Sequence, residues 1–461
     1  MTDVQESPTA IADFGGTGLR PGDEGYDVAR GVFNQMIDRS PAVIARCHSS
    51  DDVAAVITHA RTMELPLSVY GGGHSVTGAA VVDGGVCLDL RGLRTVDVDP
   101  TGRTARVGGG CTWGEVDAAT QESGLAVTGG RISTTGVGGL TLGSGSGWIE
   151  RKLGLTCDSL LEVQLATADG RLVTASDTQN PELFWGLRGG GGNFGVVTRF
   201  TFRLHEVGPI LLGGLLMYPA AMAGDVVRFY RDFIAGAPDE VCGGLAFICA
   251  PPADFVPEPV RGQPVLGVMA CYVGPVADGY QALGPLLEFG PPAISMVQPM
   301  PYVALQQMLD EACPRGMRNY WTADFLGNLP DEAVDALVER AAQPVSPLTQ
   351  INLIPGGGAI SRVPDDATAF GQRTAPWNVH YLSMWPDPAD DEVNIAYTKE
   401  TAAAMEPWTT GRSYLNFIGD EGSDRVADAF GPTAYSRLQA LKQEWDPDNV
   451  FSHNQNIRPA P

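Results

Sequence analysis

The chain has 461 residues, of which 44% are hydrophobic and 18% charged, and its formal net charge is −24 at pH 7. This length and composition predict a folded protein with two substantial domains. The acidic balance argues against nucleic acid and anionic membranes as partners, because both need clustered Lys and Arg to displace counterions. A neutral or cationic small molecule is easier to accommodate, although acidity also serves solubility alone.

The first residues, from Met1 to Glu6, are acidic and lack the basic start and apolar core of a signal peptide, and no apolar run is long enough to span a membrane. The eight cysteines have neither metal-site nor disulfide spacing, which predicts buried thiols in a reducing compartment. The six histidines include no pair at ligand spacing, so no metal site is expected. We therefore expect a cytoplasmic protein, and the sequence leaves open whether it is a monomer or a homo-oligomer.

The first elements in chain order are a strand, a helix and a strand between residues 41 and 69. Val53, Val56, Ile57 and Ala60 recur at the spacing of one buried helix face. Further elements are predicted as strands over 87–90 and 96–107, a helix from the capping box at 112–115 to about 123, a hairpin over 161–175 and a strand over 196–204.

After residue 209 the composition shifts to proline-rich connections between alternating elements. Helices are predicted around 220–235, 275–288 and 330–342, and strands around 242–249, 264–273 and 349–354. Strand groups combined with amphipathic helices indicate the α+β class.

Three glycine-rich segments are the strongest functional signal. Tyr70-Gly71-Gly72-Gly73-His74-Ser75 follows the apolar strand 65–69, a second segment covers 129–148, and a third covers 189–197. Glycine lets backbone N–H groups approach a ligand without Cβ atoms in the way. Three such loops predict one large ligand, and a dinucleotide with a pyrophosphate is the natural candidate.

A Rossmann fold does not fit these segments. Its fingerprint opens the helix of a βαβ unit, with an acidic residue about twenty positions later. Here the run Gly143-Ser144-Gly145-Ser146-Gly147 lies in the middle of the domain and is followed by Trp148-Ile149-Glu150-Arg151, with no such unit around it.

The order of motifs resembles the flavin-binding domain of the vanillyl-alcohol-oxidase/p-cresol-methylhydroxylase (VAO/PCMH) superfamily, and most closely the bacterial berberine-bridge-enzyme-like oxidases. The resemblance covers nearly the whole chain. It rests on Gly-Gly-His-Ser at 72–75, the glycine segment 135–148, Trp185-Gly186-Leu187-Arg188 with the glycines up to Gly195, Tyr414-Leu415-Asn416, Asp446-Pro447-Asp448-Asn449, and Asn454-Gln455-Asn456-Ile457.

The resemblance implies a two-domain PCMH-type FAD-binding fold whose substrate domain is an antiparallel sheet covered by helices. It divides the chain into an FAD-binding part at 1–209, a substrate domain at 210–412 and a C-terminal return to the FAD-binding domain at 413–461. His74 would carry a covalent bond to the flavin. A second attachment through cysteine occurs in close relatives, but Ile132 occupies that position here, so single attachment is expected.

Together with the loops, the resemblance implies a set of FAD-binding residues. They are Tyr70, Gly71, Gly72, Gly73, His74, Ser75, Gly130, Thr134, Thr135, Gly136, Gly138, Gly139, Leu140, Gly143, Gly145, Gly195, Val196, Asn416 and Asn454.

For catalysis, Tyr414 matches a family tyrosine that faces the flavin and in several members deprotonates the substrate. The alternative is a core tyrosine bonded to backbone. His380 is the other possible proton carrier. Plant members have a glutamate base where this chain has Arg362, so Arg362 is expected to be structural. An aromatic set could line a substrate cleft or be plain core; it comprises Tyr320, Trp321, Trp377, His380, Tyr381 and Trp385.

The leading hypothesis is an FAD-linked oxidase. A substrate alcohol, hemiacetal or amine would give hydride to the flavin, and O2 would reoxidise it with release of hydrogen peroxide. A dehydrogenase with another electron acceptor is the alternative, because Thr135 occupies the oxygen-gating position, where valine or isoleucine is more usual in the family. A flavin-retaining binding protein without turnover is the non-enzyme alternative. The substrate itself is marked by no motif.

Overall fold

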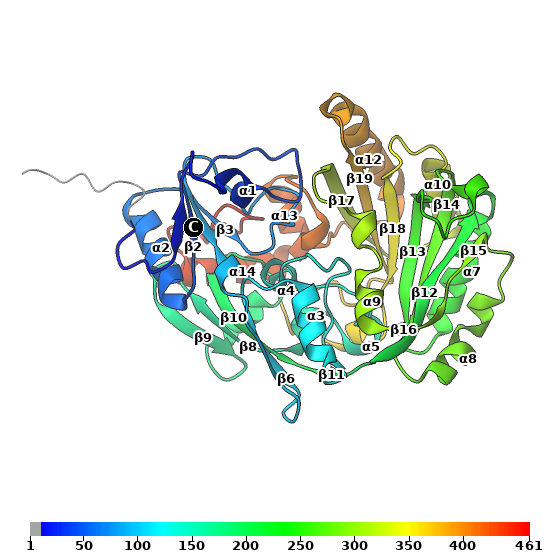
Figure 1. Ribbon diagram of the computed structural model, residues 1–461, viewed down its shortest axis with the longest axis horizontal. Helices are drawn as coiled ribbons and strands as arrows, with labels where there is room; N and C mark the ends of the chain where they lie inside the picture. The colour runs from blue at the N-terminus through cyan, green and yellow to red at the C-terminus, as the bar shows by residue number, and fades with distance from the viewer. Residues whose placement is uncertain (1–10) are drawn as a thin grey trace, which may run out of the picture.

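The computed structural model describes residues 11–461; the predicted absence of a signal peptide concerns residues 1–6, which lie outside this range. Two lobes lie side by side (Figure 1). The first lobe contains the N-terminal elements together with the last helices of the chain. The second lobe contains the elements between them, and we call it the middle lobe because it comes from the middle of the chain. Both lobes combine sheets with helices, which confirms the predicted α+β class.

A small parallel sheet places the start of the first glycine segment. Strands β2 (Val43–Arg46), β4 (Val86–Asp89) and β3 (Leu67–Tyr70) pair in parallel, and β1 (Thr17–Leu19) adds an antiparallel edge. Helix α2 (Ser50–Thr62) connects β2 to β3 in the predicted order and buries one face against the sheet. Because β3 ends at residue 70, the glycines that follow leave the sheet at its carboxyl edge, where ligands of such sheets bind.

A second sheet of the first lobe is antiparallel, with β10 at its centre between β6 and β8. Its strands in spatial order are β5 (Val96–Asp99), β6 (Thr104–Gly108), β10 (Val196–Arg203), β8 (Leu160–Ala166) and β9 (Leu172–Ser176). Helix α3 (Trp113–Gln121) begins at the predicted capping box, in which Glu115 binds the backbone N–H of Thr112. Trp113 and Phe200 belong to the apolar core between these elements.

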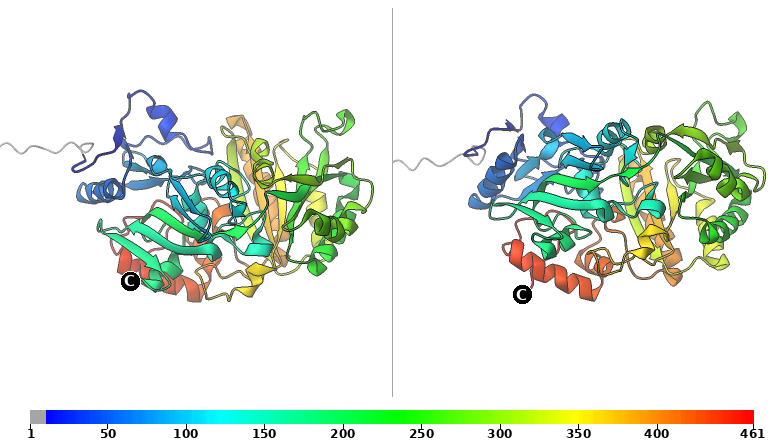
Figure 2. Two further views of the ribbon diagram at one scale, coloured as in Figure 1. Left: turned by 60° about the horizontal axis from the view of Figure 1, so that its bottom comes forward. Right: turned by 90° about the horizontal axis from the view of Figure 1, so that it is seen from below.

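The end of the chain packs onto the first lobe. Residues of α13 (Ser423–Phe430) and α14 (Pro432–Trp445) share a core with Phe184 of α6 (Pro181–Leu187), and the red helices lie against this lobe in both views of Figure 2. The fully buried Lys442 donates to the carboxylate of Asp446 and to two backbone carbonyls, so its charge is fully compensated. The division at residues 209 and 412 stays a prediction.

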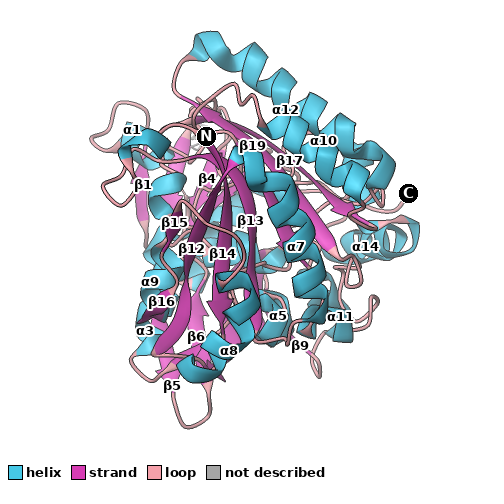
Figure 3. Cartoon of the chain, turned by 90° about the vertical axis from the view of Figure 1, so that its right-hand side faces the viewer, coloured by secondary structure: helices cyan, strands magenta, loops and turns pink. Residues whose placement is uncertain are grey.

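The middle lobe is built on one antiparallel sheet, in the order β15-β12-β14-β13-β18-β19-β17, with β16 also paired to β12. Its strands are β12 (Ile210–Pro219), β13 (Val241–Cys249), β14 (Pro264–Tyr272), β15 (Ile294–Ser295), β16 (Gln298–Pro301), β17 (Arg318–Leu326), β18 (Gln350–Pro355) and β19 (Trp377–Trp385). Helices cover its outer face (Figure 3). They are α7 (Ala223–Gly236), α8 (Val276–Leu287), α10 (Asp331–Ala341) and α12 (Asp391–Met405); three of them were predicted, and α12 was not.

Short elements complete the lobes and join them. They are α1 (Tyr26–Arg30), β7 (Leu125–Ala126), α4 (Val137–Leu142), α5 (Glu150–Leu153), β11 (His205–Glu206), α9 (Tyr302–Gln307) and α11 (Ala359–Arg362). Helix α9 packs on α3 of the first lobe, and Asp310 accepts hydrogen bonds from the backbone N–H and hydroxyl of Ser133. These contacts hold the middle lobe so that the inner face of its sheet faces the glycine segments.

All eight cysteines lie in the described range and are free thiols. Six are buried as predicted, whereas Cys249 and Cys313 are partly exposed because they line a cavity. Within residues 11–461, no helix combines the length and the apolar character that crossing a bilayer would require.

Candidate active site

A cavity of 1290 Å³ lies between the two lobes. Its walls come from the glycine segments, from the inner face of the middle sheet, and from the C-terminal segments 415–418 and 451–455. Pockets for one small ligand enclose about 300–1000 Å³, so this cavity has room for a dinucleotide and a second molecule. The predicted residues that line it are Gly71, Gly72, Gly73, His74, Ser75, Gly130, Thr135, Gly136, Gly138, Gly139, Leu140, Gly195, Val196, Asn416, Asn454 and His380.

The first and second glycine segments meet directly at Gly72 and Gly136. A Cβ on Gly72 would lie 2.3 Å from the backbone nitrogen of Gly136, and one on Gly136 would lie 2.5 Å from that of Gly72. Only glycine permits this approach of two backbones. By contrast, a Cβ on Gly139 or Gly192 would meet nothing within 4 Å. These two glycines therefore line open space in which a ligand can contact the backbone.

Four of the predicted FAD-binding residues shape the cavity wall without lining it: Tyr70, Thr134, Gly143 and Gly145. The Tyr70 hydroxyl donates to the Gly31 carbonyl over 2.6 Å. A Cβ on Gly143 would lie 2.0 Å from the side-chain oxygen of Asn416, so this glycine makes room for that amide. Their predicted role in FAD binding can only be indirect in this geometry.

His74 presents its ring to the cavity from the first glycine segment. The ring stacks on Phe33 with centroids 4.6 Å apart, and Nε2 hydrogen-bonds Thr134 Oγ1 over 2.8 Å. Nδ1 has no partner among the described residues. Burial, together with the positive charge of Arg315, lowers the pKa of His74 to about 3. The imidazole is therefore neutral, and in the tautomer whose Nε2–H donates to Thr134, Nδ1 keeps a lone pair for bonding to a ligand.

His380 lies in the opposite wall, on β19, and is 5% exposed. Its ring stacks on Phe417 with centroids 4.1 Å apart and meets the edge of Trp321 at 5.1 Å. Burial, and to a lesser degree the charge of Arg131, lowers the pKa of His380 to about 3. Its Nε2 has no hydrogen-bond partner within residues 11–461. An unpaired polar atom in a buried cavity wall is a position at which a ligand can be recognised.

A continuous row of ring contacts joins the two histidines. Phe33 stacks on His74 and meets Trp321 with centroids 5.7 Å apart, and Trp321 contacts His380. A planar ring attached at His74 would therefore lie within the space that His380 and Trp321 also face.

Tyr414 is not among the residues that line this cavity, and its place facing the flavin stays a prediction. It is 4% exposed, its hydroxyl accepts a hydrogen bond from Asn416 over 3.1 Å, and Phe417 packs edge-on against its ring. Burial raises the pKa of Tyr414 to about 12, which opposes formation of a phenolate. The geometry matches the alternative of a core tyrosine, with Asn416 rather than backbone as its partner.

The aromatic set is divided by strand alternation. Of its six members only Trp321 and His380 line the cavity. Trp377 and Tyr381 belong to the core under the outer helices, and Trp385 donates to Asp391. Alternate residues of one strand point to opposite faces, so His380 faces the cavity while its neighbours in sequence face the helices.

Arg362 also lies outside the cavity. It is paired with Asp239 over 2.6 Å and its side chain is 61% exposed. The structural role expected for Arg362 agrees with this ion pair.

The polar and aromatic cavity residues that sequence reasoning missed include Asn352, Phe417 and Arg131. Asn352 lies directly opposite His380 in the pairing of β18 with β19. Phe417 lies one position beyond the recognised Tyr-x-Asn pattern. Arg131 follows a glycine pair and is held by Glu150 over 2.9 Å and by Ser146 over 2.9 Å. An arginine directly after two glycines was the one available signal.

Comparisons with known proteins agree with this architecture. Residues 41–176 match the family described as FAD binding domain, and residues 413–458 match the family described as berberine and berberine like. The (R)-6-hydroxynicotine oxidase of Paenarthrobacter nicotinovorans is 30% identical over 458 residues, covering 96% of both chains.

Solved structures give the same result. The 6-hydroxy-D-nicotine oxidase of Arthrobacter nicotinovorans superposes with a TM-score of 0.88 at 28% identity, covering 99% of this chain and 100% of the other. A chitooligosaccharide oxidase, at 21% identity and a TM-score of 0.83 over 97% of this chain and 98% of its own, shares the fold.

Fold, cavity and comparisons define an FAD-dependent oxidoreductase. The chain belongs to the berberine-bridge-enzyme-like FAD-linked oxidoreductases of the VAO/PCMH superfamily.

The cavity fits FAD on its own geometry. Gly139 and Gly192 leave their backbone accessible, as an approaching pyrophosphate requires. His74 offers a neutral ring nitrogen from the first glycine segment. The side-chain oxygen of Asn454 is buried without a partner beside the third glycine segment, where its amide donates to the Gly192 carbonyl. These groups would hold the cofactor between the lobes.

Proposed function

We propose that this protein is an oxidase with FAD bound covalently to His74, which oxidises a CH–OH or CH–NH carbon of a small molecule and uses O2 as electron acceptor. The observation that carries the proposal is the ring of His74, which lies in the glycine cradle with Nε2 engaged by Thr134 and Nδ1 without a partner. When bound, FAD supplies hydride acceptance from the substrate and electron transfer to O2.

The residues of the opposite wall orient the substrate. His380 stays neutral because its pKa is about 3, so it can accept a hydrogen bond from a substrate O–H or N–H group. Trp321 has an indole N–H without a partner and can donate to the same polar group. Tyr414 acts as a positioning residue through its hydrogen bond with Asn416, whose amide also donates to the Leu140 carbonyl.

Both donor classes have support among related proteins. The relative of 30% identity is by name a hydroxynicotine oxidase, which favours a CH–NH donor, and the chitooligosaccharide oxidase shares the fold and favours CH–OH. A dehydrogenase remains the second candidate, because Thr135 lines the cavity at the position expected to gate oxygen. Anaerobic photoreduction of the flavin followed by admission of air separates the two: rapid reoxidation with peroxide release supports the oxidase, and slow reoxidation supports the dehydrogenase.

The attachment is tested by acid precipitation of the purified protein. We expect the yellow colour to stay in the pellet, and a tryptic peptide containing His74 to carry the mass of FAD. In His74→Ala the colour should pass to the supernatant, while FAD still binds the native protein through the glycine segments. Colour that leaves the wild-type protein completely would contradict the attachment.

Single attachment is expected from Ile132, which lines the cavity at the position of the second family link. Cys249 and Cys313 also line the cavity, so they are the thiols to examine first. Burial raises the pKa of Cys313 to about 12, which keeps its thiol protonated and a poor nucleophile. Detection of a cysteinyl flavin at either position would overturn this expectation.

A further inference from the structure

One patch on the inner face of the middle sheet consists of residues whose side chains are no larger than a methyl group. It is formed by Gly244 and Ala246 on β13 and Gly267 on β14, with Ala246 paired directly to Gly267. Neighbouring residues on the same strands, such as Phe247 and Val268, belong to the core under the helices, on the opposite face of the sheet. We call these three residues the small-residue floor.

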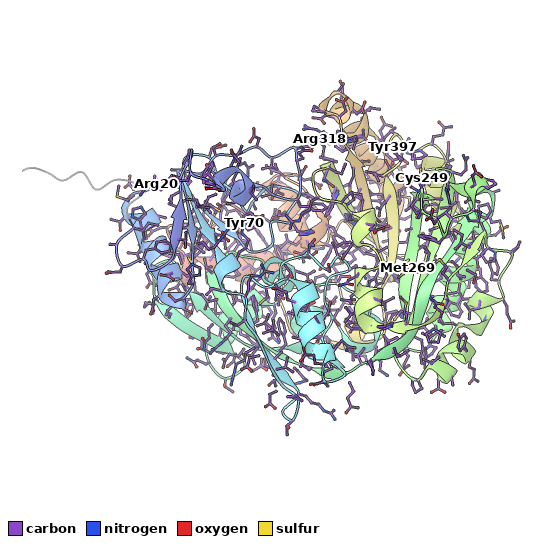
Figure 4. All side chains as sticks on the ribbon, viewed as in Figure 1. Arg20, Tyr70, Cys249, Met269, Arg318 and Tyr397 are labelled. Carbon is purple, nitrogen blue, oxygen red and sulfur yellow. The ribbon has the colours of Figure 1, made fainter. Side chains whose placement is uncertain are left out.

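Apolar side chains surround the small-residue floor. Leu215, Met217, Ile248 and Met269 line the cavity from the same three strands, and Figure 4 labels Met269 on this sheet. The methionines that line the cavity are Met217, Met269, Met296, Met300, Met308 and Met317. Unbranched thioether side chains give an adaptable apolar surface that fits ligands of irregular outline.

The apolar character extends to the mouth of the cavity. Phe255 is 48% exposed and Met296 is 39% exposed, and both line the cavity. Large exposed apolar side chains that border a pocket mark a path for an apolar ligand. The charged side chains among the described lining residues do not offset this character. Arg131 is already paired with Glu150, and Glu311 is exposed to solvent.

Unpaired polar atoms lie instead on the other strands of the same face. In the part of the chain that the structure describes, His380 Nε2 and Trp321 Nε1 are buried without hydrogen-bond partners, and Asn352 lies opposite His380. The cavity therefore has a polar end on β17, β18 and β19 and an apolar end on β12, β13 and β14. A ligand that matches it has one polar head and one apolar body.

We propose that the substrate is an uncharged amphipathic molecule whose oxidised carbon lies in its polar head, beside His380 and Trp321, and whose apolar body lies on the small-residue floor. This rests on the proposed oxidase function for the place of the reacting carbon. An oligosaccharide is a poor match, because its hydroxyl groups over the small-residue floor would lose water beside side chains that offer them no hydrogen-bond partner.

The test measures binding by isothermal titration calorimetry of the holoprotein with para-n-alkylbenzamides, from benzamide to the hexyl derivative. These probes have one neutral polar head and carry no CH–OH or CH–NH carbon, so turnover does not contribute heat. We expect Kd to fall about three- to fourfold for each added methylene until the floor is filled. Xylobiose and cellobiose should bind more weakly than every alkylated probe.

Two substitutions distinguish binding of the apolar body from binding of the polar head. Gly267→Leu fills the floor, and the nearest atoms to its Cβ belong to Leu215, Ala246 and Ile248 at ordinary contact distances of 3.4 to 3.8 Å, so the sheet accepts it. It should weaken the butyl and hexyl probes at least about tenfold and leave benzamide unchanged. Trp321→Phe removes one N–H donor and should weaken every probe by a similar factor of about three to ten.

Gly284→Leu is the matched control, because a Cβ on this glycine of α8 meets nothing within 4 Å and Gly284 does not line the cavity. It should bind the whole series as the wild type does. If Gly267→Leu does not fold, Ala246→Leu fills the same floor from the paired strand.

Three results would overturn the proposal. They are a Kd that does not change with alkyl chain length, tighter binding of xylobiose than of butylbenzamide, and an equal loss of affinity for all probes in Gly267→Leu. Failure of the oxidase function is distinguishable, because it would appear as absent peroxide or absent His74 attachment while the benzamide series keeps its chain-length dependence.

Discussion

The two walls of the cavity are built on different principles. The first-lobe wall is made of backbone, at glycines such as Gly72 and Gly136 whose missing Cβ atoms let the chain approach itself and a ligand. The middle-lobe wall is made of side chains, with Met269, Trp321 and His380 projecting from regular strands. Backbone contact demands glycine at fixed positions, whereas many side chains can form an apolar wall. The structure of the first wall therefore restricts the amino acids at its positions strongly, whereas the second wall restricts them only weakly.

The substitution expected to have the largest effect on the first wall is Gly136→Val. A Cβ at 2.5 Å from the nitrogen of Gly72 forces the two segments apart, and overpacking of this kind costs about 1–3 kcal/mol or more. We expect FAD content per protein, measured from the visible absorbance, to fall at least about tenfold. Gly236→Val is the control, because a Cβ there meets nothing within 4 Å. Normal FAD content in Gly136→Val would show that the first wall tolerates side chains.

The second prediction compares a residue inside the cavity with one behind its wall. His380→Gln should lower the rate of anaerobic flavin reduction by at least about tenfold, because it removes the ring nitrogen proposed to accept the substrate's hydrogen bond. Tyr414→Phe should lower it less than tenfold, because the Tyr414 hydroxyl contacts Asn416 and the residue does not line the cavity. Both variants should keep wild-type FAD content. The reverse order of effects would assign the proton acceptor to Tyr414, as the family resemblance implies.

The two walls also differ in how far the sequence predicts them. The glycine segments and His74 were recognised without a structure, because only glycine serves at such positions and its clustering is visible in the chain. The helices and strands around them follow from periodicity and the capping box at Thr112. The fold family was recognised in the same way, from motifs that belong mainly to the first lobe.

The middle wall was predicted poorly for physical reasons. Whether Trp321 or Trp385 faces the cavity depends on the register of β17 against β19, which no local pattern contains. Gly267 looks like any strand glycine until its paired neighbour, Ala246, shows a continuous floor. The motif predicts Tyr414 at the flavin, but it does not contain the burial of this side chain or its bond to Asn416.

The smallest expected effect concerns the charge state of the middle wall. His380 has a pKa of about 3 in the folded protein and an ordinary value of 6.5. Between these values the unfolded chain binds more protons at this site than the folded one, so the stability present above pH 6.5 is lost as pH falls toward 3.

From pH 7 to pH 5 the free energy of unfolding should therefore fall by about 1–2 kcal/mol more in the wild type than in His380→Gln. Urea unfolding followed by circular dichroism at both pH values measures this difference. Between pH 7 and pH 8 His380 is mostly neutral in either state, so the two proteins should differ in their change by only about 0.1–0.2 kcal/mol, which serves as the internal control. An equal loss of stability in both proteins below pH 6.5 would show that His380 is protonated without cost. It would then face water rather than a desolvated position in the middle-lobe wall, and the contrast between the two walls would disappear.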